Sequence, residues 1–251
     1  MHACGHDGHT TMLLGAARHL AQDRAFAGKV VFIFQPAEEM GGEDGGAARM
    51  MREGLFEKFP CDEIYGMHNW PGMAIGTFAA KGGPMMASGD GYEITIRSKG
   101  MHAAQPQRGA DTVLTAAQIT VALQQIASRQ TDPLHAIVVS TTQIHGGDAY
   151  NVLPNEVVLR GTVRAFHPEA RAQAEPSLRT IVEGVCKMTG AEATVRYERQ
   201  YPTLVNDHGA ADRALASAGK VFDTVNAAPP QTMIVEDFAF MLEDRPGCYG
   251  W

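Results

Sequence analysis

The hydrophobic pattern of the first 70 residues predicts helices alternating with short buried strands. Apolar residues recur every three to four positions over Gly8–Asp23, which predicts an amphipathic helix. Val30–Phe34 is an unbroken run of apolar β-formers, typical of a parallel strand buried on both faces. A helix over Gly45–Glu53, ended by Gly54, and a strand over Glu63–Met67 follow. This alternation predicts a parallel α/β sheet.

A different pattern begins after the glycine-rich segment 82–91. Tyr92–Arg97 alternates apolar and polar side chains, as a half-exposed strand does. The elements expected after it are a helix over 111–129 with Asp111 as N-cap, strands over 137–144 and 156–166, a helix over 168–188 ended by Gly190, and a strand over 193–199. The resulting order, β-α-β-β-α-β, is that of a ferredoxin-like unit.

The change of pattern predicts one domain inserted into another. We expect residues 1–87 to form the first part of an α/β domain, residues 88–201 to form the inserted ferredoxin-like domain, and residues 202–251 to return to the α/β domain.

Composition and charge narrow the function classes. The 251 residues carry 28 Asp and Glu against 21 Lys and Arg, a formal net charge of −7, and no basic run, which argues against nucleic-acid binding. The uncharged segment Ile64–Ala80 contains His68, Asn69 and Pro71, so we expect no membrane span. Four widely separated cysteines without a signal peptide favour a cytoplasmic location.

Residues able to bind a metal ion follow successive elements of the α/β domain. Cys4 and His6, with His9 close behind, could face one ion, because residues two apart in an extended segment point the same way. The second group, Glu38 and Glu39, follows the predicted strand 30–34, and two adjacent acids can divide metal binding and proton transfer between them. Each group alone also has an ordinary interpretation, as a disordered terminus or as a solvated acidic pair.

His68, just past the strand 63–67, adds a third group at the same sheet edge. A lone histidine there is more often a hydrogen-bonded core residue than a ligand. The coincidence of all three groups favours a site for Zn²⁺, Mn²⁺ or a related divalent ion. In the inserted domain, by contrast, the spacing of His102, the loop around Asn151 and Gly161–Arg164 favours ordinary turns between strands.

Together, these segments resemble the M20 metallopeptidases, specifically the amidohydrolase branch that contains hippurate hydrolases, N-acyl-amino-acid amidohydrolases and plant auxin-conjugate (IAA-amino acid) hydrolases. The resemblance covers essentially the whole chain. It rests on motifs in the order Met1–His9, Gln35–Glu39, Gly66–Asn69, His102–Ala104, Asn151–Pro154, Gly161–Arg164 and Glu236–Phe238.

The resemblance implies a zinc-peptidase-like α/β catalytic domain with an inserted ferredoxin-like α+β dimerisation (lid) domain. Its two divalent metal ions, Zn²⁺ or Mn²⁺ with Co²⁺ and Ni²⁺ also acceptable, would be held by Cys4, His6, Glu39 and His68. Glu38 would be the general base, and His102 would stabilise the oxyanion in the partner subunit of a homodimer. Asn151 and Arg164 would hold the substrate carboxylate, and Asp237 would have a supporting place.

Two departures from the family pattern lead us to expect a fragment. Relatives carry an opening βα unit before the position of Met1 and a further His ligand beyond that of Trp251. We expect hydrolysis of the amide bond of small N-acyl amino acids. The alternatives are a truncated, inactive metal-binding or dimerising fragment and a hydrolase with Cys4 as nucleophile. RNA binding by the ferredoxin-like domain is the weakest alternative, because its strands lack the aromatic RNP pattern.

Overall fold

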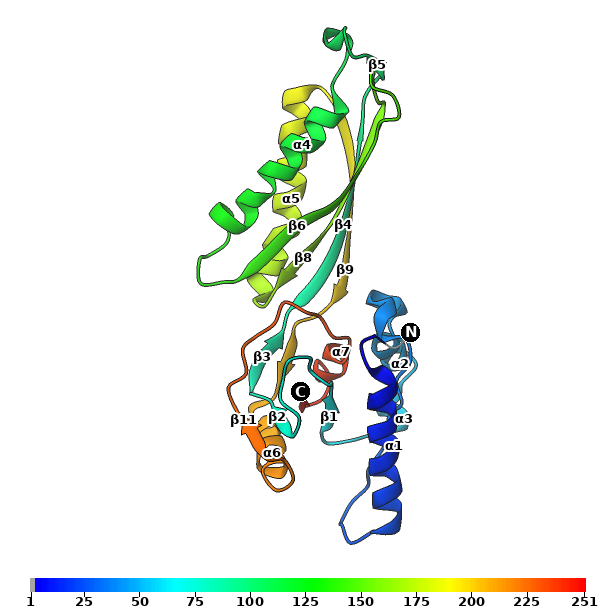
Figure 1. Ribbon diagram of the computed structural model, residues 1–251, viewed down its shortest axis with the longest axis vertical. Helices are drawn as coiled ribbons and strands as arrows, with labels where there is room; N and C mark the ends of the chain where they lie inside the picture. The colour runs from blue at the N-terminus through cyan, green and yellow to red at the C-terminus, as the bar shows by residue number, and fades with distance from the viewer. Residues whose placement is uncertain (1–2) are drawn as a thin grey trace. The chain divides into compact units, whose positions relative to one another are not determined.

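The computed structural model describes residues 3–251, which divide into two compact units. Unit 1 runs up to Met86 and resumes with Leu204–Trp251, and unit 2 is the intervening Ala87–Thr203. Figure 1 shows the chain leaving unit 1 through β3, building unit 2, and returning through β10. Each unit is described by itself below.

Unit 2 is a four-stranded antiparallel sheet with two helices on one face (Figure 1). The strands are ordered β6-β8-β4-β9, and the chain follows the β-α-β-β-α-β path of a ferredoxin-like unit. The bounds are β4 Ser88–Arg97, β5 Met101–His102, the 3₁₀ helix η3 Pro106–Arg108, α4 Thr112–Ala122, the π-helix η4 Ile126–Gln130, β6 Ile137–His145, β7 Val152–Leu153, β8 Glu156–Ala165, α5 Pro168–Thr189 and β9 Glu192–Tyr201.

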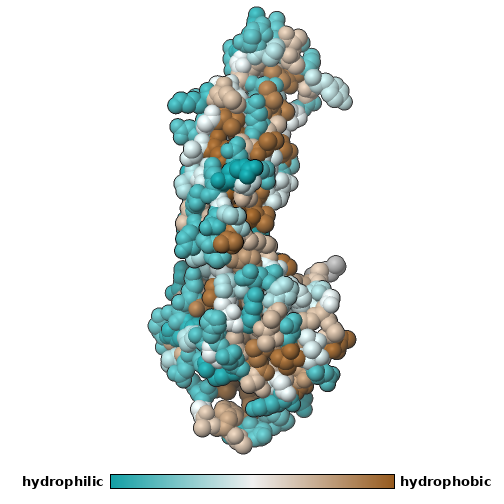
Figure 2. Space-filling model, turned by 90° about the vertical axis from the view of Figure 1, so that its left-hand side faces the viewer, coloured by the Kyte–Doolittle hydropathy of each residue, from teal (hydrophilic) through white to brown (hydrophobic). Residues whose placement is uncertain are grey.

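The periodicity of the sequence explains how unit 2 buries its core. Along β4, Tyr92, Ile94 and Ile96 alternate onto the helix-covered face and are all buried. On α5, every fourth residue from Ala170 to Cys186 is buried, which gives one apolar stripe against the sheet. Apolar side chains of α4 also reach the surface, and the view from the side of these helices shows brown atoms among the teal ones (Figure 2).

The predicted helix over 111–129 is confirmed, but its last part is a π-helix rather than an α-helix. The cap is confirmed, since the Asp111 carboxylate accepts a hydrogen bond from the backbone N–H of Leu114 at 2.9 Å. However, α4 ends at Ala122 and η4 follows. The Thr131 N–H and hydroxyl both donate to the Ile126 carbonyl, so the last turn closes with i→i+5 spacing.

The described residues of unit 1 form three two-stranded pairs. β1 pairs with β12 and β2 with β11, both in parallel, and β3 pairs antiparallel with β10. The bounds are α1 His6–Gln22, the 3₁₀ helices η1 Glu38–Met40 and η2 Gly42–Asp44, α2 Gly46–Arg52, α3 Leu55–Lys58, β1 Ile64–Met67, β2 Thr77–Ala79, β3 Gly83–Met86, β10 Leu204–Asn206, α6 His208–Ala218, β11 Thr224–Asn226, α7 Ala239–Leu242 and β12 Gly247–Gly250.

The prediction of a strand over Val30–Phe34 is wrong. The segment belongs to no helix or strand, and Val30 and Phe34 are 45% and 47% exposed. A strand needs a neighbour that takes its backbone hydrogen bonds, and no strand among residues 3–251 pairs with this segment. The described strands of unit 1 therefore do not form the continuous parallel sheet expected here, although Ala79 of β2 and Trp251 after β12 exchange two backbone hydrogen bonds that link the β2–β11 and β1–β12 pairs. The predicted amphipathic helix α1 forms, but it buries none of its residues.

Within the described part of the chain, no helix is both long and apolar enough to cross a membrane.

Candidate metal centre

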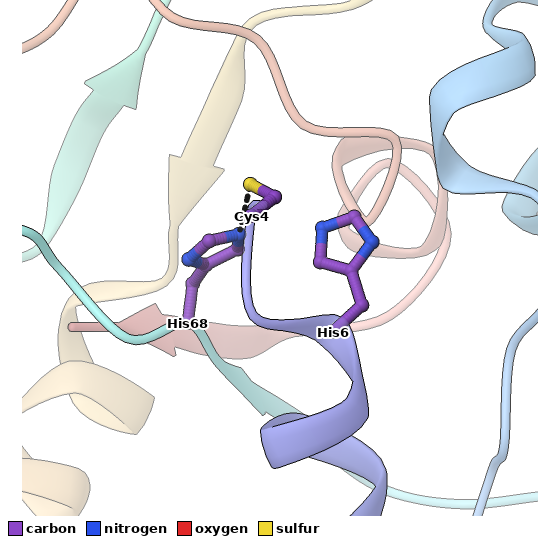
Figure 3. A group of neighbouring side chains, drawn as sticks. All are labelled: Cys4, His6 and His68. Atoms are coloured by element: carbon purple, nitrogen blue, oxygen red, sulfur yellow. Dashed lines mark hydrogen bonds between the residues drawn. The ribbon is translucent and has the colours of Figure 1, made fainter. Parts of the chain in front are cut away.

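Cys4 and His6 lie at the start of α1 and are brought together by a turn. Gly5 is the N-cap of α1 and has a left-handed backbone, with φ of 83°. The sequence argument from an extended segment is therefore wrong in its geometry, although both side chains still face the same space, as Figure 3 shows. Glycine is favoured here because a left-handed φ is costly for residues with a Cβ.

His68 reaches the same space from the end of β1. Its backbone N–H donates to the Gly250 carbonyl at 3.0 Å, which extends the β1–β12 pairing by one residue. The ring nitrogen Nδ1 lies 2.6 Å from the Asn69 carbonyl oxygen and donates to it, so Nε2 carries the free lone pair. Nε2 lies 3.4 Å from the Cys4 sulfur (Figure 3). The ligand atoms of Cys4, His6 and His68 are all within 4.8 Å of one another.

His9 and Asn69 join the segments that carry these ligands. His9 Nε2 lies 3.0 Å from the Asn69 backbone nitrogen and also contacts Asn69 Oδ1, and this one ring nitrogen makes one of the two hydrogen bonds at a time, depending on its tautomer. The Asn69 side chain packs on Gly5, where a Cβ would lie 2.7 Å from Asn69 Oδ1. The sequence analysis gave no role to this contact, although His9 and Asn69 each stand in a motif next to a proposed ligand.

Glu38 and Glu39 form the short helix η1, which follows a left-handed Ala37 with φ of 57°. Ligand atoms of His6, Glu38 and Glu39 form a second group within 4.8 Å. His6 is therefore common to both groups. Glu38 is half-buried and Glu39 is exposed.

Glu236 and Asp237 form a buried acidic pair behind Glu38. The Tyr249 hydroxyl donates to Glu236 Oε2 at 2.6 Å. Asp237 accepts hydrogen bonds from the Gln35 side chain at 2.6 Å and from the Ala47 backbone N–H at 3.0 Å. Ligand atoms of Glu38, Glu236 and Asp237 lie within 4.8 Å. Glu236 stands in the motif Glu236–Phe238, from which the sequence assigned a supporting place to Asp237 alone; the signal for Glu236 is a pair of acids in the apolar run from Met233 to Met241.

The electrostatics of the cluster are those of crowded carboxylates. Burial, Glu236, Asp237 and Glu39 together raise the pKa of Glu38 to about 8. Burial also raises the pKa of Glu236, to about 7, and raises the pKa of Asp237. The pKa of the Cys4 thiol is raised by burial and by the nearby Glu39 and Glu38, and burial lowers the pKa of His68. Negative charge is therefore unfavourable here without a positive ion.

These residues fit a divalent cation. A thiol, two imidazoles and a carboxylate are ligands that Zn²⁺ and Mn²⁺ accept, and the free lone pair of His68 Nε2 points at the Cys4 sulfur. Hydrogen bonding of the second imidazole nitrogen to a carbonyl is typical of histidine ligands. A cation would also offset the repulsion among the carboxylates.

The remaining predicted site residues lie in unit 2. His102 is in β5, which pairs with β7, and its Nδ1 accepts a hydrogen bond from the Ala104 N–H at 3.1 Å. Asn151 is next to it, with its carbonyl accepting from the Ala103 N–H at 2.9 Å. Arg164 is in β8, half-buried, and its Nη1 is a buried donor without a hydrogen-bond partner among the described residues. Burial lowers the pKa of Arg164.

Comparison with known proteins connects this geometry to a family. The family model for peptidase family M20/M25/M40 matches residues 1–251. The chain is 38% identical over 252 residues to an N-acetyl-L-cysteine deacetylase of Bacillus subtilis, covering 100% of this chain and 59% of the relative. It is 38% identical over 253 residues to a hippurate hydrolase of Campylobacter jejuni, covering 100% of this chain and 65% of the relative.

Comparison with solved structures also finds a protein of the M20 family. The crystal structure of the YXEP protein of Bacillus subtilis, described as a dinuclear metal-binding peptidase of the M20 family, superposes with a TM-score of 0.81 at 36% identity. The match covers 100% of this chain and 63% of that one. The chain thus spans less than two thirds of the length of these relatives. Because the family model covers every residue, the chain belongs to peptidase family M20/M25/M40.

Proposed function

We propose that the protein hydrolyses the amide bond between an acyl group and an amino acid, using two divalent metal ions. The observation that carries this proposal is the approach of Cys4, His6 and His68 to one another, with Glu38 and Glu39 grouped around the same His6. The names of the deacetylase and the hippurate hydrolase, which both describe removal of an acyl group from an amino acid, support the substrate class.

Different residues of unit 1 would bind the metal ions and transfer the proton. Cys4, His6, Glu39 and His68 would hold the ions, which when bound polarise the substrate carbonyl and make water a better nucleophile. Glu38, half-buried beside the ligands, would take a proton from water and deliver it to the leaving nitrogen. Two adjacent acids suit this division, because Glu39 is exposed to the shared space while Glu38 faces the buried pair Glu236 and Asp237.

Three residues of unit 2 would also have roles in the reaction. The Ala104 N–H holds His102 Nδ1 as an acceptor, so Nε2 carries the proton and can donate a hydrogen bond to an oxyanion. The unpartnered, buried Nη1 of Arg164 suits a substrate carboxylate, with Asn151 as a second contact. His102 would serve the partner subunit of a homodimer formed through unit 2, whose edge strand β6 is exposed from Gln143 to His145.

Glu38→Gln tests the role of the base. The variant keeps the size of the side chain and should keep bound metal, measured by elemental analysis, while the turnover of N-acetyl and N-benzoyl amino acids falls at least 10²-fold. Glu57→Gln, in α3 of the same unit, is the matched control and should retain turnover. Full activity of Glu38→Gln contradicts the assignment, and a wild-type chain that binds metal without turnover supports the inactive-fragment alternative.

Homodimer formation is tested by sedimentation equilibrium of the wild-type chain. The proposal expects twice the mass of one chain. If the chain is a monomer at assay concentrations, and its turnover rate per chain equals that of the dimer at higher concentration, the assignment of His102 to the partner's site is contradicted.

One observation favours a second candidate, a hydrolase with Cys4 as nucleophile. Cys4 Sγ and His68 Nε2 lie 3.4 Å apart, which is the contact that a thiol–imidazole pair requires. Against it, the pKa of Cys4 is raised and that of His68 is lowered, the opposite of what a thiolate–imidazolium pair needs. A chelator should abolish activity of the metal enzyme and leave the cysteine enzyme active, and restoration by Zn²⁺ or Mn²⁺ would exclude the second candidate.

A further inference from the structure

Asp237 lies at the neck of the loop that carries Glu38 and Glu39. Its side chain is fully buried, and its two carboxylate oxygens bind opposite ends of the loop. One oxygen accepts from the Gln35 side chain before the loop, and the other accepts from the Ala47 backbone N–H after it. A single carboxylate therefore fixes the separation between the two ends of the segment 36–46.

The two ends of this loop are also packed tightly against each other. The Gly46 backbone N–H donates to the Ala37 carbonyl at 3.2 Å, and a Cβ on Gly46 would overlap the Pro36 carbonyl. Ala47 is the second residue of α2, and neither Gly45 nor any other nearby residue supplies a side-chain cap, so Asp237 takes the place of the missing N-cap. The two ends of the loop are therefore held together by a backbone hydrogen bond, by close packing of Gly46 on Pro36, and by the Asp237 side chain.

Asp237 also lies close to the proposed base. One carboxylate oxygen each of Asp237, Glu236 and Glu38 lies within 4.8 Å of the others. The preceding residue, Glu236, is anchored by the buried Tyr249 hydroxyl at 2.6 Å, and Tyr249 belongs to β12, the strand paired with β1. The segment that holds Glu38 and its loop is therefore tied to the strand pair from which His68 extends.

We propose that Asp237 is a positioning residue that places Glu38 and Glu39 relative to His6 and His68, through the hydrogen bonds of its side chain to both ends of the loop. The inference rests on the proposed function for the meaning of that placement, but the contacts themselves exist in the metal-free chain. A purely structural role, a helix cap on α2, is the alternative. The positioning role and the structural role predict different effects of removing the Asp237 carboxylate on the mobility of the loop and on metal affinity.

Amide hydrogen exchange of the metal-free chain separates them. Asp237→Leu removes both side-chain hydrogen bonds at similar volume, and we expect the protected amides of Met40, Gly41, Gly45 and Gly46 to exchange at least tenfold faster, with β1 and β12 unchanged. Asp237→Asn should stay within about threefold of wild type, because its amide oxygen can accept from Ala47 while Gln35 turns its own oxygen toward the new NH₂ group. Faster exchange throughout unit 1 means a structural role and overturns the proposal.

The matched control is Asp207→Leu. Asp207 caps α6 in the same unit by accepting from the Ala210 N–H at 2.8 Å, so its replacement also removes a helix cap. It should leave exchange in the segment 37–46 at the wild-type rate. If Asp237→Leu does not fold, Gln35→Leu takes its place, since it cuts the contact at one end of the loop and leaves the Ala47 bond. Wild-type exchange in the segment 37–46 of that variant would also overturn the proposal.

Zinc affinity is the second measurement. Competition with a chromophoric chelator should give a 10–100-fold weaker affinity for Asp237→Leu and near wild-type affinity for Asp237→Asn and Asp207→Leu. A loosened loop with unchanged zinc affinity overturns the positioning role. If the wild-type chain binds no zinc, the proposed function fails, and the exchange experiment still decides whether Asp237 holds the loop.

Discussion

Each unit buries carboxylates, but the two units neutralise them differently. In unit 2, Asp90 is 1% exposed and pairs with Arg171 through two guanidinium nitrogens, with the Tyr197 hydroxyl as a third donor at 2.9 Å. In unit 1, Glu236 and Asp237 are equally buried, yet the ion pairs among residues 3–251 include none that joins either acid to a Lys or Arg.

The difference indicates which acids stabilise the fold and which serve a site. A buried carboxylate is stable when a fixed cation and hydrogen bonds compensate for its lost hydration, as at Asp90. The pair in unit 1 has hydrogen bonds from Tyr249, Gln35 and Ala47, but its pKa values remain raised. We interpret the uncompensated charge as the counterpart of divalent cations bound beside it.

Replacing Arg171, the positively charged partner of the buried Asp90 in unit 2, should have the largest effect on stability. Arg171→Met leaves Asp90 buried without its partner, and we expect it to lower the free energy of unfolding by about 3–5 kcal/mol. Urea denaturation measures this loss. Arg160→Met, which breaks the exposed pair with Glu93, is the matched control and should cost about 0–1 kcal/mol. Equal losses in the two variants would show that burial of Asp90 is not what makes its pair important.

Adding an external cation should stabilise unit 1 by a somewhat smaller amount. Free Zn²⁺ at 100 times its dissociation constant should raise the free energy of unfolding by about 2.7 kcal/mol, because it binds the folded chain preferentially. His68→Ala should lose this stabilisation, whereas His19→Ala, which replaces an exposed histidine of α1 outside the cluster, should keep it. Equal zinc stabilisation in both variants would place the ion elsewhere.

The smallest expected effect comes from the turn between Cys4 and His6. Gly5→Ala puts a Cβ 2.7 Å from Asn69 Oδ1 at a left-handed φ, and we expect a loss of about 1–2 kcal/mol together with weaker zinc binding. Gly15→Ala, within α1 and with nothing within 4 Å of the added Cβ, should instead stabilise the chain by about 0.5–1 kcal/mol. Thermal unfolding with and without zinc measures both. A neutral Gly5→Ala would mean that the turn is not restrictive.

The sequence was a good guide in unit 2, where the periodicity of each element marks the face that it buries. In unit 2, the predicted strands over 137–144 and 156–166, the helix over 168–188 and its end at Gly190 are confirmed within a few residues, because the alternation along β4 and the i,i+4 stripe of α5 face one another across a single core. The π-turn at Ile126 could not be predicted, since it depends on hydrogen bonds from Thr131 rather than on periodicity.

In unit 1, the pattern predicted the chemistry better than the secondary structure. The Val30–Phe34 run has the composition of a buried strand but no pairing neighbour, and composition cannot supply one. The grouping of Cys4, His6 and His68 followed from motifs that end adjacent elements, yet the ties that hold it, His9 to Asn69 and Asp237 to Gln35 and Ala47, are long-range contacts that no local pattern encodes. Whether the named residues act as ligands stays a prediction.

Titration of the metal-free chain with Co²⁺ tests the central claim most directly, because cobalt bound by a thiolate absorbs in the near ultraviolet through charge transfer from sulfur. We predict that this absorption develops in the wild-type chain, disappears in Cys4→Ser, and persists in Cys61→Ser, which replaces a half-buried cysteine of the same unit. Absorption that survives in Cys4→Ser, or a wild-type chain that binds no cobalt, would contradict a metal centre built from Cys4, His6 and His68.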